Sequence, residues 1–312
     1  MNNGQIFNNK AKRVKFFLAV AFAISWLTAL VIYFNGGLVN SPELIPGTGI
    51  TLALILLASV YMWGPAIAHI ITRLVSKEGW STAFLKPEIK TGWPWWLVGW
   101  FGPSLLVLVG ALVYFVIFPA SYDAQLTMLT SQLDLAGMSG ESISPWQIVL
   151  LQTGVAMLIS PLLNLVATFG EEFGWRAYLL PKLAEKGTRK ALIISSLIWG
   201  VWHWPVILMG HNYGLGYWGY PWSGLLAMTW FCLSAGVFIG WVTLKAGSVW
   251  PAVFAHGALN GLAAIGMLFV KGQPEMLLGP TPAGIIGALP FTVISLAILL
   301  TIRDHLDSQP VE

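Results

Sequence analysis

The stretch Gly170-Glu171-Glu172-Phe173-Gly174-Trp175-Arg176 follows a hydrophobic run, Gln147 to Phe169, and places two carboxylates and a guanidinium at its end. A charged group inside hydrocarbon costs about 3 kcal/mol on insertion scales, so an ionisable cluster in a membrane segment indicates function. If the helix continues, Glu172 and Arg176 stand at i and i+4, in the orientation that favours an ion pair. Glu171 is rotated by about 100° and points to another neighbour. The alternative is a cytosolic helix end with ordinary interfacial charges.

The composition is that of an integral membrane protein. The 312 residues are 56% hydrophobic and 9% charged, with a mean hydropathy of +0.73, whereas soluble domains have about 25% charged residues. The net charge is only +3 and the basic residues lie in loops, which argues against a nucleic-acid partner and leaves the lipid bilayer as the environment. Cys232 is the single cysteine, which excludes an internal disulfide and a cysteine-based zinc cage. We expect one membrane domain over residues 1–312.

Apolar runs long enough to cross a hydrocarbon core of about 30 Å recur along the chain. Alternating strand-like segments are absent, so the sequence predicts an all-α polytopic membrane protein, a bundle of about eight transmembrane helices. The first run is longer than a signal-peptide core and is interpreted as a retained span. The expected spans are Phe16–Phe34, Ile50–Val75, Trp95–Phe118, Gln147–Phe169, Ala191–Met209, Gly224–Leu244, Val249–Val270 and Ala283–Ile302.

The distribution of Lys and Arg predicts the orientation of this bundle. With the N-terminal tail in the cytoplasm, 15 of the 16 Lys and Arg residues fall on the cytoplasmic side, and Lys271 falls outside. The positive-inside rule therefore predicts that both termini are cytoplasmic. The aromatic stretch from Tyr213 to Trp222 lies in an outer loop and is typical of an interfacial belt.

Two further spans carry polar side chains where lipid disfavours them. His203 lies in the fifth span, and His256 and Asn260 lie in the seventh. His256 and Asn260 are at i and i+4, so they project from one helix face and can meet one small group. Each side chain, taken alone, is explained by a hydrogen bond between neighbouring helices. Together with the glutamates they form the side-chain set of a hydrolytic site.

The residue types indicate how such a site hydrolyses a peptide. Glu171, a carboxylate in a low dielectric, is the expected base that activates water. His203 orients that water, and the Asn260 amide and the His256 imidazole donate hydrogen bonds to the oxyanion. A metal-dependent alternative uses Glu171, His203 and His256 as zinc ligands with an open position for water. Because the sequence lacks a His-Glu-x-x-His spacing, zinc is a possible cofactor and not a firm one.

Three motifs carry a resemblance to a known family. Glu171-Glu172-x-x-x-Arg176, an aromatic-x-x-x-His ending at His203, and His256-x-x-x-Asn260 follow one another on successive membrane segments. In this order they resemble the CAAX protease and bacteriocin-processing (CPBP) family of intramembrane proteases. The resemblance covers a core over residues 147–266.

This resemblance implies an eight-helix intramembrane endopeptidase, and we expect it in a bacterial cell membrane. The second motif of the family usually begins with Phe, whereas this chain has Trp199, for which we expect a packing change. The eukaryotic branch removes the last three residues from prenylated Cys-a-a-X proteins, and bacterial members are linked to bacteriocin maturation, self-immunity or surface-protein processing. The substrate is then a peptide or protein that enters from the membrane or the cytoplasmic side. The catalytic residues that the resemblance implies are Glu171, His203, His256 and Asn260, with Glu172, Arg176 and Trp199 in support.

Two other functions come from different classes. A secondary transporter also places polar residues near the middle of the membrane, but it usually has two related halves, and the polar motifs here lie between Glu171 and Asn260 without an earlier counterpart. A non-proteolytic scaffold or immunity protein needs the bundle but not the polar set. Proteolysis that depends on Glu171 distinguishes an enzyme from both.

Overall fold

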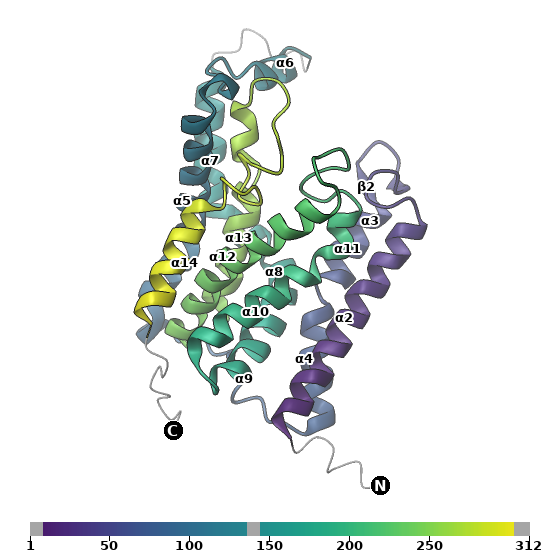
Figure 1. Cartoon of the computed structure of the whole chain (residues 1–312), viewed down its shortest axis with the longest axis vertical. Helices are drawn as coiled ribbons and strands as arrows, with labels where there is room; N and C mark the ends of the chain where they lie inside the picture. The colour runs from purple at the N-terminus through teal and green to yellow at the C-terminus, as the bar shows by residue number, and fades with distance from the viewer. Residues whose placement is uncertain (1–8, 136–143, 303–312) are drawn as a thin grey trace.

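The computed structural model describes residues 9–135 and 144–302, and this part of the chain is almost entirely helical (Figure 1). Within it, seven helical stretches are long and apolar enough to cross a membrane. The expectation of an all-α polytopic membrane protein is therefore confirmed. The seven stretches are Lys10–Phe34, Leu52–Ser76, Ile89–Ile117, Pro145–Leu163, Thr188–Leu208, Trp222–Ala246 and Trp250–Phe269.

The α-helices are α2 (Lys10–Phe34), α3 (Leu52–Leu56), α4 (Gly64–Ser76), α5 (Ile89–Ile117), α6 (Thr127–Leu135), α7 (Pro145–Leu163), α8 (Leu165–Gly174), α9 (Leu180–Ala184), α10 (Thr188–Trp202), α11 (Trp204–Leu208), α12 (Trp222–Ala246), α13 (Trp250–Leu262) and α14 (Leu289–Thr301). Two π-helical turns, η1 (Leu57–Tyr61) and η3 (Trp175–Leu179), and two 3-10 turns, η2 (Pro119–Ser121) and η4 (Ile265–Phe269), connect them. The strands β1 (Glu43–Ile45) and β2 (Ile50–Thr51) form a small antiparallel hairpin.

Several expected spans are interrupted by features that hydropathy does not detect. The fourth span ends at Leu163, and α8 begins only after Asn164. The fifth is divided at His203 between α10 and α11. The eighth expected span is reduced to α14, an apolar helix of 13 residues, because turns occupy the start of that segment. The expected eight spans thus correspond, in the described residues, to seven full-length stretches and one short apolar helix.

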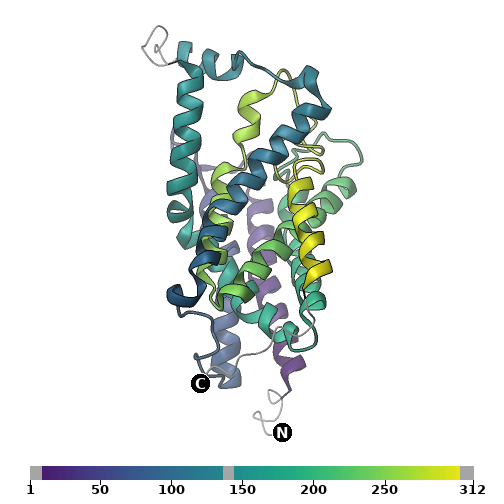
Figure 2. The ribbon, with the colours of Figure 1, turned by 90° about the vertical axis from the view of Figure 1, so that its left-hand side faces the viewer.

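The helix α12 lies at the centre of the bundle (Figure 1). It packs against α10, and also against α5, α13 and α14. The helix α13 packs on α5 and α7, which form the face that Figure 2 turns toward the viewer together with α14. The helix α8 lies between α4 and α13. This packing brings α8, α10 and α13, the three helices with polar motifs, to the interior.

The two ends of the bundle differ in their content (Figure 1). We call one the basic end; it holds the start of α2, the α4–α5 connection, α9 and the α12–α13 connection. We call the opposite one the loop end; it holds residues 35–51, 118–126, 209–221 and 263–288. At the loop end, an isolated bridge joins Tyr122 to Val270. At the basic end, Val249 donates a backbone hydrogen bond to Phe84 at 2.9 Å.

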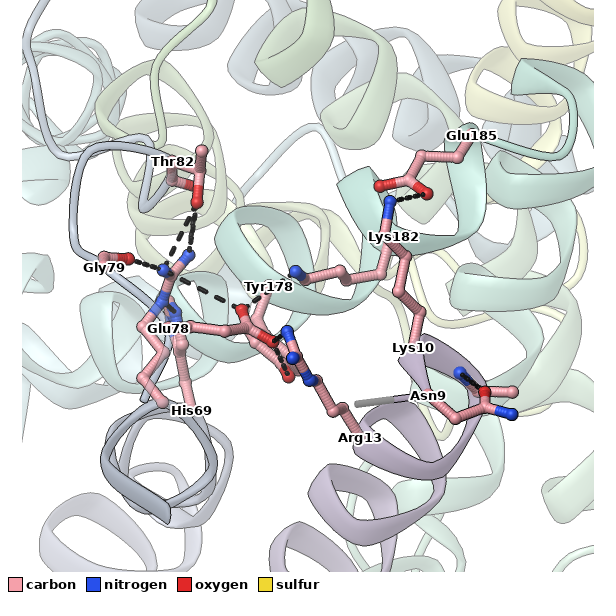
Figure 3. Close-up of polar contacts among 12 residues, drawn as sticks. Asn9, Lys10, Arg13, His69, Glu78, Gly79, Thr82, Tyr178, Lys182 and Glu185 are labelled. Atoms are coloured by element: carbon pink, nitrogen blue, oxygen red, sulfur yellow. Dashed lines mark hydrogen bonds and ion pairs between the residues drawn. The ribbon is translucent and has the colours of Figure 1, made fainter. Parts of the chain in front are cut away.

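At the basic end, the Glu78 carboxylate joins segments that are far apart in the sequence (Figure 3). It lies 2.8 Å from the Arg13 guanidinium of α2 and 2.8 Å from the Lys182 ammonium of α9, and the Tyr178 hydroxyl donates to it at 3.4 Å. Burial raises the pKa of the Glu78 carboxyl, but the hydrogen-bonded Lys182 and Arg13 outweigh burial and hold that pKa below its ordinary value. The ionised carboxylate therefore stabilises the folded state.

Replacing Glu78 with Gln should lower the free energy of unfolding by on the order of 1–3 kcal/mol, because Arg13 and Lys182 lose a shared counter-charge. Thermal unfolding in detergent measures the change. Since the folded-state pKa of Glu78 is depressed, its contribution is complete above the ordinary value of about 4.3 and is lost as pH falls through the folded-state value. The Tm difference between wild type and Glu78→Gln should therefore shrink in acid.

The matched control is Glu185→Gln. Glu185 pairs with Lys10 at 2.8 Å, but these side chains are 47% and 66% exposed, so removing this pair should change the Tm little. A Glu185→Gln effect as large as that of Glu78→Gln would contradict the role given to Glu78.

Candidate active site

The glutamate motif lies on α8, which approaches α4 closely through two glycines. A Cβ at Gly170 would lie 2.8 Å from the Met62 carbonyl oxygen, and a Cβ at Gly174 would lie 2.4 Å from the Pro65 Cβ. No larger residue fits at these distances without moving α4 or Met62 just before it, so the glycines allow backbone to pack on backbone. The two glutamates between them are consequently buried.

Glu172 is the centre of a buried ion network. The Arg176 Nε lies 3.2 Å from Glu172 Oε2, and Arg176 Nη1 donates to Glu172 Oε1 at 3.3 Å. The His256 Nδ1 also bonds to Glu172 Oε1, at 2.9 Å. The predicted Glu172–Arg176 ion pair is confirmed. Because a carboxylate oxygen accepts, Nδ1 of His256 carries the hydrogen, and Nε2 remains for another partner.

Glu171 turns away from this network, as the helical rotation predicts. Its Oε2 accepts a hydrogen bond from the Trp199 indole Nε1–H at 2.7 Å. The Arg176 guanidinium lies over the same indole ring, 4.4 Å from its centroid. Trp199 therefore contacts Glu171 through its N–H and the Glu172–Arg176 pair through its ring face. The Trp199 indole thus donates a hydrogen bond that Phe at this position could not donate; the expected packing change stays a prediction.

His203 lies at the break between α10 and α11. Pro205 has no N–H with which to continue α10, and it stands in the first turn of α11 instead. The His203 Nδ1 bonds to the Trp199 backbone carbonyl at 2.8 Å. Since a carbonyl oxygen accepts, Nδ1 carries the hydrogen, and Nε2 presents a lone pair. The broken helix thus fixes the tautomer of this histidine.

Four of the expected residues line one cavity of about 290 Å³: Trp199, His203, His256 and Asn260. His256 and Asn260 line it together, which confirms that they share one helix face. Glu171 is only 2% exposed and is not part of the lining. Its contact with the cavity wall is the hydrogen bond from Trp199, so the structure brings two histidines and the asparagine to one surface and places the carboxylate behind it.

The ligands of the zinc alternative do not converge on one point. Within residues 9–135 and 144–302, no three His, Cys, Asp or Glu side chains are placed to hold one metal ion. In the described residues Glu171, His203 and His256 are therefore not grouped as a zinc shell. The dependence of activity on a metal stays a prediction.

The site also contains side chains that the sequence does not single out. The Tyr61 hydroxyl donates to the Trp202 carbonyl beside His203. Cys232 Sγ lies 3.6 Å from the His203 Nδ1, and His211 lines the cavity from the loop end. Cys232 could have been identified as a candidate site residue, because it is a polarisable side chain within an apolar run. Nothing in the sequence places Tyr61 against α10, because tertiary packing alone determines that contact.

Comparisons with known proteins agree with the three motifs. Residues 152–262 match the model of the family described as Type II CAAX prenyl endopeptidase Rce1-like, and this segment holds every motif residue from Glu171 to Asn260. The chain is also similar to "CAAX prenyl protease 2" of Methanococcus maripaludis, with 34% identity over 102 residues. That alignment covers 32% of this chain and 37% of the relative, so the chain spans little more than a third of the relative's length. This segment is therefore similar to CAAX prenyl endopeptidases, in agreement with the resemblance that the three motifs carry.

Proposed function

We propose that this protein is an intramembrane endopeptidase of the CAAX prenyl protease type, in which Glu171 activates the water that hydrolyses a peptide bond. The observation that supports this most directly is the difference between the two adjacent glutamates. Glu172 is held by Arg176 and His256, whereas Glu171 is bonded to the neutral Trp199 indole. A general base must accept a proton, and Glu171 is the carboxylate that no cation directly engages within the described residues.

In this mechanism a water molecule lies between Glu171 and His203. The His203 Nε2 lone pair accepts a hydrogen from the water and orients it, and Glu171 takes the other proton as the water oxygen attacks the carbonyl carbon. The carbon–nitrogen bond then breaks, and the proton held by Glu171 passes to the leaving amine. One water is consumed, and one carboxylate and one amine are formed without a covalent enzyme intermediate.

The opposite wall of the cavity would stabilise the oxyanion. The Asn260 amide donates a hydrogen bond, and so does the His256 Nε2 when the imidazole is protonated. The bond between the His256 Nδ1 and Glu172 Oε1 holds the imidazole in one orientation and leaves Nε2 for the oxyanion. Arg176 and His256 share the Glu172 carboxylate, so the ion network acts on the reaction through His256.

The proposed substrates are membrane-bound peptides or proteins. The name of the Methanococcus relative supports a C-terminal Cys-a-a-X peptide as the substrate. The alternative is a related bacterial peptide or protein. The seven apolar stretches support a membrane location, and we propose the bacterial plasma membrane. A scaffold, immunity protein or transporter would have the same bundle and no peptidase activity.

Changing Glu171 to Gln should lower kcat by roughly 10²-fold or more, because the amide keeps the shape of the side chain but cannot accept the proton. Cleavage can be followed with a farnesylated peptide ending in Cys-a-a-X and with a co-expressed single-span reporter tagged at both ends. Wild-type protein that cleaves neither substrate would identify a scaffold or transporter instead.

The neighbouring Glu172→Gln is the matched control, and its main effect should be on stability. It leaves the buried Arg176 without a counter-charge, which costs about 3–5 kcal/mol when the site is fully shielded. The Tm in detergent should fall, and Arg176→Met added to this variant should restore part of it. A fully stable, inactive Glu172→Gln beside an active Glu171→Gln would reverse the two roles.

Changing Trp199 to Phe should reduce kcat by about tenfold and leave KM nearly unchanged. The ring on which Arg176 stacks and which lines the cavity remains, but the N–H that orients Glu171 is lost, and a hydrogen bond to a charged group contributes about 1.5–3 kcal/mol. Steady-state kinetics and a Tm measurement on the same sample separate the effects. An unchanged kcat with a lowered Tm would show that the bond serves stability alone.

The ligand geometry predicts that exhaustive chelation leaves activity intact and that elemental analysis finds no stoichiometric zinc. Peptide cleavage before and after dialysis against a strong chelator measures the first, with a known zinc protease as the positive control. Activity that is lost on chelation and restored by zinc would make Glu171, His203 and His256 metal ligands.

A further inference from the structure

The cavity at the site is lined by two separate groups of polar side chains. His203 and Asn260 belong to the polar motifs, and the proposed mechanism uses them. His211, Asn212 and Thr281 also line the cavity, but they belong to connections of the loop end, after α11 and before α14. We call these three residues the loop-end cluster. The proposed mechanism gives them no role.

The structure holds the loop-end cluster in place. Asn212 has a φ of 65°, a left-handed conformation that Asn adopts more readily than most residues. The hydroxyl of the next residue, Tyr213, donates to the Ala283 carbonyl at 2.7 Å. This bond fastens the connection that carries His211 to the connection that carries Thr281, so the cluster is a fixed part of the cavity wall.

The donors of the loop-end cluster are available to a ligand. Within residues 9–135 and 144–302, the buried Thr281 hydroxyl has no hydrogen-bond partner, and rotation about the Cα–Cβ bond turns it toward the cavity. The Asn212 Nδ2 donates to the Met228 Sδ at 3.5 Å, and a thioether is a weak acceptor. His211 is exposed and lines the cavity. A ligand oxygen at this place would therefore meet three donors.

The charge of the cavity favours an anion at the loop-end cluster. Among the described residues that line the cavity, none is Asp or Glu, so no lining carboxylate repels an anion, and none is Lys or Arg. A carboxylate beside an imidazole favours the protonated ring, which donates a charge-assisted hydrogen bond. His211 is thus the side chain of the cluster that can supply a positive charge.

The distance between the two polar groups suits a short peptide. α13 runs from the basic end toward the loop end and is followed by η4 (Figure 1). A Cβ at Gly266 would lie 2.8 Å from the Pro280 carbonyl oxygen, so Gly266 lies beside Thr281. The six steps from Asn260 to Gly266 cover about 9–12 Å along α13 and η4. Three extended residues span about 10 Å.

We propose that the loop-end cluster binds the C-terminal carboxylate of the substrate and thereby selects the bond that is cleaved. This inference rests on the proposed peptidase function and deepens it. The carboxylate accepts hydrogen bonds from His211, Asn212 and Thr281, and the peptide bond that then lies at His203 and Asn260 is the one hydrolysed. The last residues of the substrate occupy the cavity, and the rest of the substrate lies beyond His203. This orientation requires no opening at the loop end.

Two farnesylated peptides of one sequence ending in Cys-a-a-X, one a C-terminal acid and the other a C-terminal amide, test this subsite. Wild-type protein should cleave the acid with a kcat/KM about tenfold or more above that of the amide, because only the acid offers a charge to His211. His211→Ala should bring the acid-to-amide ratio close to one, mainly through a higher KM for the acid. Thr281→Val, which keeps the shape of the side chain, should lower the ratio about threefold.

The matched control is Trp218→Phe. Trp218 lies on the same connection as His211, but it is 82% exposed and does not line the cavity, so this variant should keep the wild-type ratio. If His211→Ala lowers the Tm in detergent, His211→Gln, which retains an N–H donor, should give a ratio between those of His211→Ala and wild type.

Equal cleavage of the acid and the amide by wild-type protein would overturn the carboxylate subsite and leave the peptidase function intact. A His211→Ala variant that cleaves both peptides more slowly at an unchanged ratio would also overturn it, because a structural role alone gives that result. Cleavage of neither peptide, nor of the tagged reporter, would refute the peptidase function itself. The affinities of the two peptides for Glu171→Gln, measured by fluorescence polarisation, report the preference for the carboxylate separately from cleavage.

Discussion

The buried contact between Glu172 and Arg176 is the interaction on which the site depends. Both side chains are almost completely shielded, at 0% and 2% exposure, so either charge alone would be costly by several kcal/mol. The pair is extended by His256, which bonds to the same carboxylate, and by the Trp199 ring beneath the guanidinium. α8, η3, α10 and α13 are therefore held in one relative position by a single network. Loss of one member leaves the others with unmatched charges or donors.

Close helix packing makes room for this network. A Cβ at Gly236 of α12 would lie 2.5 Å from Ser196 Oγ and 3.3 Å from Arg176 Nη2, so α12 can pass the buried guanidinium only with glycine at this position. Arg176 itself lies in the π-helical turn η3, a backbone form that is rare and frequent at functional sites. The network is thus accommodated by the backbone on both sides, by a missing side chain on α12 and by a widened turn after α8.

The sequence predicts the membrane class and the helical bundle, which the structure confirms, because hydropathy is a local property. The residues of the site stay a prediction, and the cavity that Trp199, His203, His256 and Asn260 line is consistent with it. The Glu172–Arg176 pair is such a local feature, and it is present as predicted. The breaks at Asn164 and His203 are not detected by hydropathy, because the residues on either side are equally apolar. The hydrogen bond of Trp199 and the cluster around Glu78 depend on partners far along the chain, and no pattern in one sequence assigns those partners. Contacts between residues one helical turn apart could therefore be derived, and contacts with partners far along the chain could not.

Tryptophan side chains donate hydrogen bonds to backbone carbonyls that the helix breaks leave without a helical partner. Pro161 removes the donor that would bond to the Met157 carbonyl, and the Trp100 indole N–H occupies that carbonyl at 3.1 Å. At the break after α10, the Trp202 carbonyl lacks its helical partner and accepts both the Trp26 indole N–H at 3.2 Å and the Tyr61 hydroxyl. Phe at position 100 would fill the same space without donating, and an unpaired Met157 carbonyl would cost about 1–3 kcal/mol. Two of the 17 tryptophans, Trp100 and Trp26, therefore supply hydrogen-bond donors at these breaks where lipid cannot. The broken α10 that positions His203 is one of the structures that such donors stabilise.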